Sequence, residues 1–488
     1  MFNQPLSHLR FFVISIALLL SACTTLSDPI LKTDTPDKWR NTLTKLDNEA
    51  APKAAWWSSL KDPILDKSVE LALKQNLSLA QALERLNAAR ASEKATLANQ
   101  YPHVDFTAGP DNLARPTPES VIDAQSAKPE DSLRTTGAYI AGFDLIWELP
   151  IFGRGEGQRK VEKAAIASVE ADIHTTRISI SAEVVRTYGQ LRAAQDRLHI
   201  LDSLISHHQM LAALIVKGQQ AGLFSDNEQD NSHTAITDLR NEELITLAHK
   251  ESALQRLSVL CGLSSPLTDW LDLSSTPWIL THLAKPPSIL PADLIRSRSD
   301  IHHAEAAVLQ ASGEAGIAHA DLYPKLAIEG ALMLVGNLSG ATRTTQVITV
   351  LAPSVRIPLV DWGLAREVVN AREANLREAI LAYREAVLLA IEDTENALSN
   401  FNASEERLVR TEKETEYIKA KSEKLESAFK AGYLSRPELL RMEIKLLEQE
   451  SQLIDSKVSW IGDFAIANKS LSTMNASSTE IVTPSQNN

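Results

Sequence analysis

The sequence AGLFSDNE at residues 221–228 returns as AGYLSRPE at residues 431–438, a separation of 210 positions (431 − 221). The two copies share Ala, Gly, Ser and Glu in the same register. Gly153 and Gly363 have the same separation, so the 68-residue segments that lead from each glycine to each copy are equal in length. We therefore predict two internal repeats, which are too few for a solenoid.

Both 68-residue segments are predicted to be continuous helices. Neither contains proline, and at about 1.5 Å per residue each helix would be roughly 100 Å long. In the second segment the apolar positions recur at an average spacing near 3.5, as in a coiled coil; they are Leu376, Ile380, Tyr383, Val387, Ala390, Thr394, Leu398 and Phe401. Each half therefore predicts a long helical hairpin that bends at the Ala-Gly pair, where glycine can adopt the left-handed conformation that ends a helix.

A third pair of landmarks, Tyr101-Pro102 and Tyr323-Pro324, is separated by 222 positions (323 − 101). Each landmark precedes a segment in which apolar and polar residues alternate. This alternation predicts four strands, at about 102–112, 136–149, 325–335 and 346–357. Strands of about ten residues with one apolar face match membrane-crossing β-strands. Four strands cannot close a barrel, and lipid does not tolerate an open sheet edge, so several chains must contribute. The alternative, a soluble β-sandwich with helices, leaves the apolar stripe of each long hairpin unburied.

The fold class that we predict is an α+β membrane protein, mainly long helical hairpins (an α-barrel), with four strands per chain. The expected divisions are a signal peptide (1–22), a lipidated N-terminal segment (23–60), a first repeat (61–263), a Pro-rich connector (264–290), a second repeat (291–472) and a disordered tail (473–488).

The N-terminus has the layout of an export signal that ends in Leu-Ser-Ala-Cys at residues 20–23. This ending resembles a bacterial lipobox, so Cys23 is expected to carry N-acyl and S-diacylglycerol lipid; the alternative is an ordinary cleaved signal with a chance cysteine. Thr24 follows, with no Asp beside the cysteine, which favours the outer membrane. The remaining cysteine, Cys261, is then without a disulfide partner and is interpreted as a small buried apolar residue.

Composition excludes several classes of protein. The chain carries 49 Lys and Arg against 62 Asp and Glu, a net charge of −13, which argues against a nucleic-acid partner. Apart from the N-terminus there is no apolar run of eighteen residues, which excludes a polytopic helical membrane protein. There is no phosphate loop or Gly-x-Ser-x-Gly motif, so neither a catalytic site nor an enzyme is expected. The pairs His207-His208 and His302-His303 lack metal-ligand spacing and are interpreted as solvated helix residues.

Several motifs together resemble a known family. They are Trp56-Trp57 with the sequence DPILD at 62–66, WELPIFGR at 147–154, LPADL at 290–294, Tyr323-Pro324 and PLVDWG at 358–363. In their order and duplication these motifs resemble the TolC-like outer membrane factors, specifically the lipidated OprM/NodT branch, from about residue 55 to 470. One departure is Arg298-Ser299-Asp300, where the family usually has Arg-Pro-Asp; it is expected to alter a helix start but not the function.

The resemblance implies a homotrimer with a 12-stranded barrel in the outer membrane and a 12-helix barrel through the periplasm. Such proteins are passive exit ducts of tripartite efflux pumps, which bind a periplasmic adaptor protein and an inner-membrane RND-type transporter. Two alternatives stay open: an outer-membrane duct for type I protein secretion, and a non-conducting periplasmic coiled-coil lipoprotein. The sequence does not identify the exported compound, because the inner-membrane partner selects it.

The candidate functional residues lie at the hairpin tips and on the strands. The resemblance implies an acidic ring near the second tip, so Glu438 is the first gate candidate, and a solvated or adaptor-facing carboxylate is its alternative. Arg441, Arg436 and Glu228 are further gate candidates, since the arginines could pair with Glu228 or Glu438 of a neighbouring hairpin and hold the tip shut. The candidate adaptor-docking residues are Gly222, Ser225, Gly432 and Ser435, for which ordinary helix capping is the alternative. Asp144 and Glu148 are expected to line the lumen.

Overall fold

The computed structural model describes residues 31, 36–41, 55–111, 138–220, 222–223, 225–264, 284–287, 289–337 and 345–472. The signal peptide, Cys23 and the tail from residue 473 lie outside the described residues, as does most of the connector. Two compact units divide the chain: one comprises residues 1–31, 87–167 and 306–381, and the other comprises 32–86, 168–305 and 382–488.

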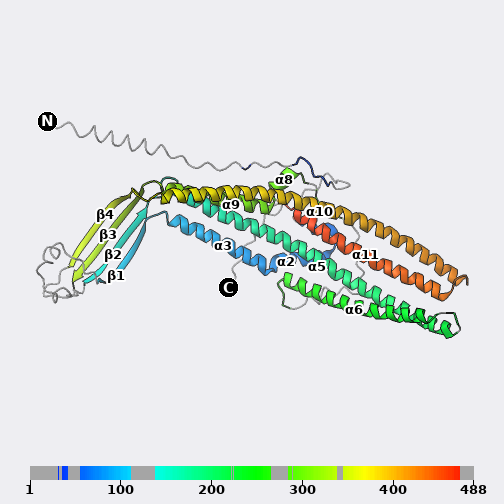
Figure 1. Cartoon of the computed structure of the whole chain (residues 1–488). Coiled ribbons are helices and arrows are strands. Elements are labelled where there is room, and N and C mark those ends of the chain that lie inside the picture. The colour runs from blue at the N-terminus through cyan, green and yellow to red at the C-terminus, as the bar shows by residue number, and fades with distance from the viewer. Residues whose placement is uncertain are drawn as a thin grey trace, which may run out of the picture. The chain divides into compact units, whose positions relative to one another are not determined.

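The first unit contains a four-stranded sheet (Figure 1), in the order β1 (His103–Asp111), β2 (Ala138–Glu148), β3 (Lys325–Asn337) and β4 (Thr345–Arg356). The four strands confirm the prediction, and all three neighbouring pairs are antiparallel. Because consecutive strands pair directly, β1 and β4 are left at the two edges of the sheet.

The strand registers follow the spacing of the sequence landmarks. In the first hairpin of strands His103 faces Ile146, and in the second Lys325 faces Arg356. Moving His103 by 222 positions and Ile146 by 210 gives the second pair (103 + 222 = 325; 146 + 210 = 356). The separations found in the sequence therefore carry one register onto the other without a slip, which a single inserted residue would have caused.

The two faces of the sheet differ in charge. Successive side chains of a strand point to opposite faces, and directly paired residues share a face. The charged residues and the histidine whose side chains the structure describes in these strands share one face: His103, Asp105, Asp144, Glu148, Lys325, Glu329 and Arg356. The opposite face carries the apolar positions of the alternating pattern, including Phe106 and Phe143, whose ring centroids lie 5.3 Å apart.

The helices occur in pairs of equal length. Helices α3 (Leu77–Ala98) and α9 (Ser299–Ala320) have 22 residues each, and α5 (Arg154–Gln220) and α10 (Leu364–Lys430) have 67. Helices α6 (Asp226–Leu260) and α11 (Arg436–Ser470) have 35 residues each. The shorter elements are η1 (Trp56–Leu60), α2 (Pro63–Gln75) and α8 (Pro291–Ile295). The chain is therefore mainly helical, as predicted. No helix in the described part of the chain is both long and apolar enough to cross a membrane.

The core of the second unit contains the predicted stripe of α10 from Tyr383 onward. Val387, Thr394 and Phe401 are buried, and Phe401 lies 6.2 Å from each of two α11 rings, Trp460 and Phe464. Cys261 is also buried, as predicted, and burial raises the pKa of its thiol to about 11. Core packing, rather than covalent crosslinking, therefore fixes these helices within the described residues.

Candidate functional site

The two hairpin tips lie in the second unit and share one backbone geometry. Gly222 and Gly432 have positive φ angles of 73° and 80°. At the second tip the Gly432 N–H donates to the Phe429 carbonyl (2.9 Å), and the Tyr433 N–H donates to the Ala428 carbonyl (2.9 Å). This is the Schellman pattern of a helix end, and the first tip repeats it. The tip glycines therefore do cap helices, whatever else they do.

Both tips expose a large apolar side chain directly after the glycine. Leu223 is 75% exposed and Tyr433 is 87% exposed. The two residues occupy matching positions of the repeat (433 − 223 = 210), and no core requires either of them. Each tip thus has a large apolar side chain, at an equivalent position, that is exposed to solvent.

Each tip continues into a capped helix. Ser225 and Ser435 are the N-caps of α6 and α11, and each forms a capping box with the glutamate three residues later. The Glu438 carboxylate accepts hydrogen bonds from the Ser435 hydroxyl (2.6 Å) and backbone N–H (3.0 Å). These bonds lower the pKa of Glu438, and the charge of Arg441 adds to the effect. Glu438, the candidate gate residue, is therefore fixed in position and ionised near neutral pH.

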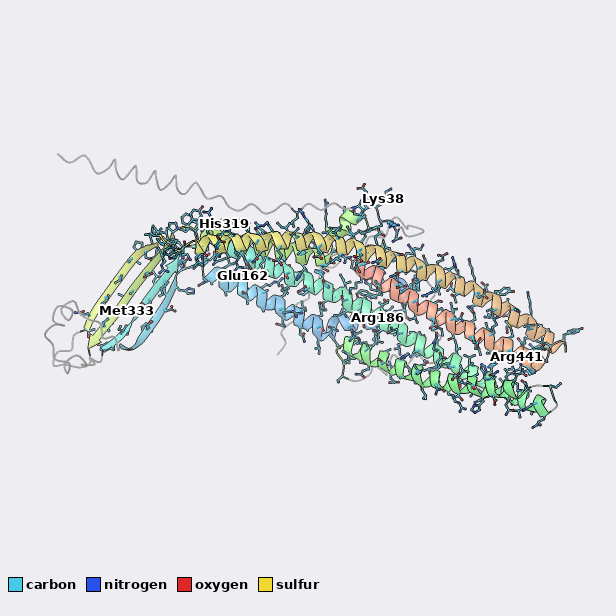
Figure 2. The ribbon with its side chains drawn as sticks, in the orientation of Figure 1. Lys38, Glu162, Arg186, His319, Met333 and Arg441 are labelled. Carbon is cyan, nitrogen blue, oxygen red and sulfur yellow. The ribbon has the colours of Figure 1, made fainter. Side chains whose placement is uncertain are left out.

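One ion pair joins the two hairpins near their tips. Arg441, labelled on α11 in Figure 2, donates from Nη2 to Glu228 Oε1 of α6 at 3.2 Å. Both side chains are substantially exposed, at 49% and 40%. Such pairs contribute only about 0 to 1 kcal/mol each. The pair is thus a weak link between hairpins within one chain.

Arg436 contacts side chains of its own hairpin in this chain, and its pairing with Glu228 or Glu438 of a neighbouring hairpin stays a prediction. Its guanidinium lies 3.7 Å from Glu443 Oε1 and 5.7 Å from the centroid of the Phe429 ring. The charge of Arg436 is therefore directed along the second hairpin, toward α10 and α11.

The histidines at 207 and 208 are more buried than expected. His207 Nδ1 lies 2.7 Å from the Ser203 carbonyl, and its Nε2 lies 3.4 Å from Glu443 Oε2. Burial lowers the pKa of His208. The reason is that α5 packs against α11, with Leu211 and Leu440 in a shared apolar cluster. Within the described residues no group of three or more His, Cys, Asp or Glu could hold a metal ion.

Further from the tips, Arg197 joins three helices. From α5 it reaches Glu242 of α6 (Nη1 to Oε1, 3.3 Å) and Asp455 of α11 (Nη2 to Oδ1, 2.6 Å). Sequence reasoning missed this residue, because its partners lie 45 and 258 positions away. No local signal marked it, because Arg197 stands among other polar residues of α5, including Arg192, Asp196 and Asp202.

The two candidate lumen residues, Asp144 and Glu148, lie on the charged face of the sheet in the first unit. Asp144 accepts a hydrogen bond from Thr107 of the neighbouring strand (3.1 Å), and Glu148 lies 3.8 Å from Arg154 Nε. Their position on the polar face is what a water-filled lumen requires.

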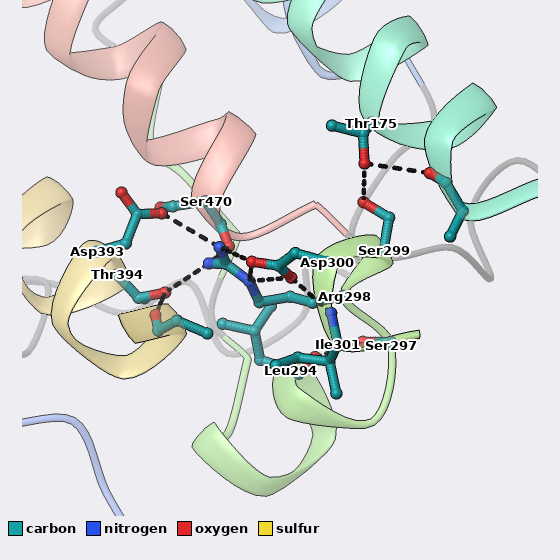
Figure 3. A network of polar contacts seen from close by, with 12 residues as sticks. Thr175, Leu294, Ser297, Arg298, Ser299, Asp300, Ile301, Asp393, Thr394 and Ser470 are labelled. Atoms are coloured by element: carbon teal, nitrogen blue, oxygen red, sulfur yellow. Dashed lines mark hydrogen bonds and ion pairs between the residues drawn. The ribbon is translucent and has the colours of Figure 1, made fainter. Parts of the chain in front are cut away.

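A second polar network surrounds Arg298 at the start of α9 (Figure 3). Its guanidinium donates to Asp300 (2.8 Å) and Asp393 (3.2 Å), to the Thr394 hydroxyl (3.1 Å) and to the Ser470 carbonyl at the end of α11 (2.9 Å). Ser299, in place of the family's usual proline, contacts the Thr175 hydroxyl at 2.8 Å. Arg298 therefore connects α9, α10 and α11.

The N-terminal segment contacts α10 beside this network. The backbone N–H groups of Arg40 and Asn41 donate to the Glu395 carboxylate at 2.6 and 3.0 Å. Trp39 Nε1 donates to the Ile289 carbonyl at 2.6 Å. Glu395 thus holds the segment that leads toward Cys23, although Cys23 itself lies outside the described residues.

The sequence is similar to a known protein family and to several of its members. Residues 68–263 and 290–465 match the profile of the family described as outer membrane efflux protein. The chain is 26% identical over 434 residues to the pyoverdine export outer membrane protein OpmQ of Pseudomonas putida, covering 87% of this chain and 88% of OpmQ. It is 25% identical over 452 residues to nodulation protein T of Rhizobium leguminosarum bv. viciae, covering 91% and 88%.

The structure also resembles that of the outer-membrane channel OprN, with a TM-score of 0.72 and 27% identity over 91% of this chain and 98% of OprN. This agreement covers both the four-stranded sheet and the long helices. The chain therefore belongs to the outer membrane efflux protein family, as an efflux channel of the outer membrane that extends into the periplasm.

Proposed function

We propose that three copies of this chain close into one exit duct, with a 12-stranded β-barrel in the outer membrane and a 12-helix α-barrel in the periplasm. The observation that carries the proposal is the sheet itself. It has one charged face, one apolar face and two unpaired edge strands, β1 and β4. In lipid such edges must be paired, and closure with other copies pairs them.

Three copies fit better than two. Two copies would give eight strands, and a barrel of that size is filled by its own side chains. Three copies give twelve strands and leave room for a lumen lined by the charged face. The equal lengths of α5 and α10 and the matching registers support a ring built from six similar repeats.

The duct serves a tripartite pump. A periplasmic adaptor protein docks on the tips around Gly222, Ser225, Gly432 and Ser435, and an inner-membrane RND-type transporter supplies the substrate. The exposed Leu223 and Tyr433 support this docking site, because they repeat at matching positions without a structural need. OpmQ, one relative, is named for export of pyoverdine, and we propose that this chain likewise passes small molecules.

Lipid on Cys23 anchors the protein in the outer membrane. The contacts of Trp39, Arg40 and Asn41 support this proposal, since they hold the segment after Cys23 against the helices. A Cys23→Ala variant is expected to lose labelling by radioactive palmitate, and labelling that persists would contradict the assignment.

Glu438 restricts the periplasmic end of the closed duct. Three ionised copies around a narrow pore attract cations and repel one another, which favours cation passage. The lowered pKa and the fixed position of the carboxylate support this role.

The duct is tested by its mass and conductance. The detergent-purified protein is expected to have the mass of three chains and to form cation-selective pores in planar bilayers. A monomer, or a trimer without conductance, would contradict the proposed function.

Adaptor docking is tested with cysteines that leave the capping boxes intact. Leu223→Cys and Tyr433→Cys are expected to crosslink to the adaptor in cells, whereas Ser427→Cys, an exposed position below the second tip, is the matched control. A functional pump with no crosslinks from either tip would contradict tip docking.

A further inference from the structure

Within one chain the first repeat joins the second along a continuous seam in the first unit. Strand β2 pairs with β3, so that Leu145 faces Gly330. Beyond the strands, the Leu149 N–H donates to the Leu326 carbonyl at 2.9 Å. The seam ends in two stacked aromatic rings, those of Phe152 and Tyr323.

Phe152, in the turn after β2, stacks on Tyr323, in the turn before β3. Their ring centroids lie 5.0 Å apart, and the ring planes differ by 15°. The stack covers the seam where strands give way to helices. It leaves Phe152 partly buried and Tyr323 45% exposed.

The matching positions of the second repeat are exposed to solvent. Leu359, Val360 and Trp362 stand 210 positions after Leu149, Pro150 and Phe152, and they are 87%, 75% and 96% exposed. Their first-repeat counterparts are all partly buried. Tyr101, which stands 222 positions before Tyr323, is 69% exposed. One chain thus holds both halves of a second seam, at opposite edges of the sheet (Figure 1).

The backbone of the second turn has the same conformation as the first turn, in which Phe152 stacks on Tyr323. Phe152 and Trp362 have φ angles of 55° and 56°, and the glycines that follow them have 87° and 85°. A bulky residue with positive φ is uncommon and persists where surrounding contacts fix it. Phe152 has such a contact in Tyr323. Trp362, at 96% exposure, has the conformation without the contact.

We propose that the β4 edge of one chain docks on the β1 edge of a second copy in the register that β2 and β3 show within the chain, with Trp362 stacked on Tyr101 of that copy. The inference rests on the proposed trimer and specifies its interface. The repeat separations give the pairs: Val355 faces Ala108 (145 + 210; 330 − 222), and the Leu359 N–H donates to the Val104 carbonyl (149 + 210; 326 − 222).

The second seam differs from the first where its side chains differ. Within the chain Arg154 forms an ion pair with Asp321, but the matching residues are Leu364 and Asn99, which cannot form one. The seam between copies is therefore apolar at the turn, as the 69% exposure of Leu364 also requires.

The two seams also differ in the residues of the helices next to the turn. Gly157 and Gly313 allow α5 and α9 to approach so closely that an added Cβ on Gly157 would lie 2.8 Å from the Gly313 carbonyl. The matching residues, Glu367 and Ala91, do not allow that approach. The strands and the aromatic turn must therefore provide more of the contact between copies than they provide within the chain.

Disulfide trapping tests the register. In a Cys261→Ala background, Val355→Cys with Ala108→Cys is expected to give covalent trimers, since facing residues lie about 4.5 to 5.5 Å apart and a disulfide needs about 4.4 to 6.8 Å between Cα atoms. The matched control is Val355→Cys with Val104→Cys, displaced by four residues or about 13 Å, which is expected to stay at the single-cysteine background.

The outcomes separate the register from the trimer. Crosslinking in the control pair but not in the 355/108 pair would overturn the register, while the mass of the uncrosslinked variants would still report three chains. Absence of trimers in the Cys261→Ala background would overturn the proposed function, and this inference with it.

A double-mutant cycle tests the aromatic contact. Trp362→Ala and Tyr101→Ala are each expected to lower the temperature at which detergent trimers dissociate, and the double variant is expected to fall no further than the worse single one. Trp362→Phe should retain most of the wild-type value. Additive losses, as expected if lipid rather than a second copy covers Trp362, would overturn the contact.

Discussion

Replacing Arg298 by alanine tests how far one guanidinium stabilises the junction of α9, α10 and α11. The side chain is 12% exposed, and it donates to two buried acceptors, the Thr394 hydroxyl and the Ser470 carbonyl. Leaving a buried acceptor unsatisfied costs about 1 to 3 kcal/mol. The partly exposed Asp300 and Asp393 add only about 0 to 1 kcal/mol each, because water replaces the lost contact.

The expected local loss is therefore about 3 to 5 kcal/mol, most of it at the end of α11, where the Arg298 cation also lies at the negative end of the helix dipole. Since about 1.4 kcal/mol corresponds to a factor of ten, amide hydrogen exchange in the last turn of α11 should become more than about a hundredfold faster. Peptides that contain Ala467 and Leu471 report this turn, and peptides from the start of α11 serve as an internal reference.

Two variants make the measurement decisive. Arg298→Lys keeps the charge but cannot reach four acceptors with one ammonium group, so an intermediate exchange rate is expected. Arg296→Ala removes an exposed arginine two positions away and should leave exchange unchanged. If Arg298→Ala and Arg296→Ala exchange alike in this turn, the reasoning about buried acceptors is wrong.

Three further predictions concern the second unit. Glu438→Gln keeps an acceptor for Ser435 but removes the charge, so single-channel conductance should rise and cation selectivity should fall; unchanged values would reject the gate. Ser435→Ala removes the hydroxyl that most strongly lowers the Glu438 pKa; because a depressed carboxyl pKa keeps the charge until the pH falls through that value, the variant should lose cation selectivity at a higher pH during acid titration than the wild type, and coincident titrations would refute this. Glu395→Ala should speed amide exchange at Arg40 and Asn41, while Glu392→Ala, an exposed residue on the same helix, should not; equal effects would show that the carboxylate does not hold the N-terminal segment.

The strands and long helices could be predicted because each of their sequence patterns occurs in both internal repeats. A period of two near Phe106 and Phe143, against a spacing near 3.5 along α10, distinguishes strand from helix without any knowledge of packing. The separations of 210 and 222 positions also relate the two strand registers, since no residue is inserted or lost within the paired strands themselves. The difference of 12 residues (222 − 210) lies in the segments that join β1 to β2 and β3 to β4.

The polar networks could not be predicted, because their partners are distant in the chain. Arg298 and Asp300 are neighbours in sequence, but Asp393 and Ser470 lie 95 and 172 positions from Arg298. The sequence predicts a solvated His207, since its own helix offers only the Ser203 carbonyl, to Nδ1, and nothing to Nε2. Only the packing of α5 on α11 brings Glu443 to within 3.4 Å of it.

The tips show how a repeat can keep a geometry and change its chemistry. Both have a left-handed glycine, a Schellman ending and a Ser-Glu capping box, so the backbone presents the same shape twice. Between the serine and the glutamate that the two tips share, however, the first tip has Asp226-Asn227 and the second has Arg436-Pro437. An adaptor that docks on both tips must therefore accept one shape with opposite charges. Arg436→Asp, which gives both tips an acidic residue, should weaken binding of the adaptor to immobilised trimers without altering the helix start, because Ser435 and Glu438 remain; unchanged affinity would mean that the adaptor recognises tip shape alone.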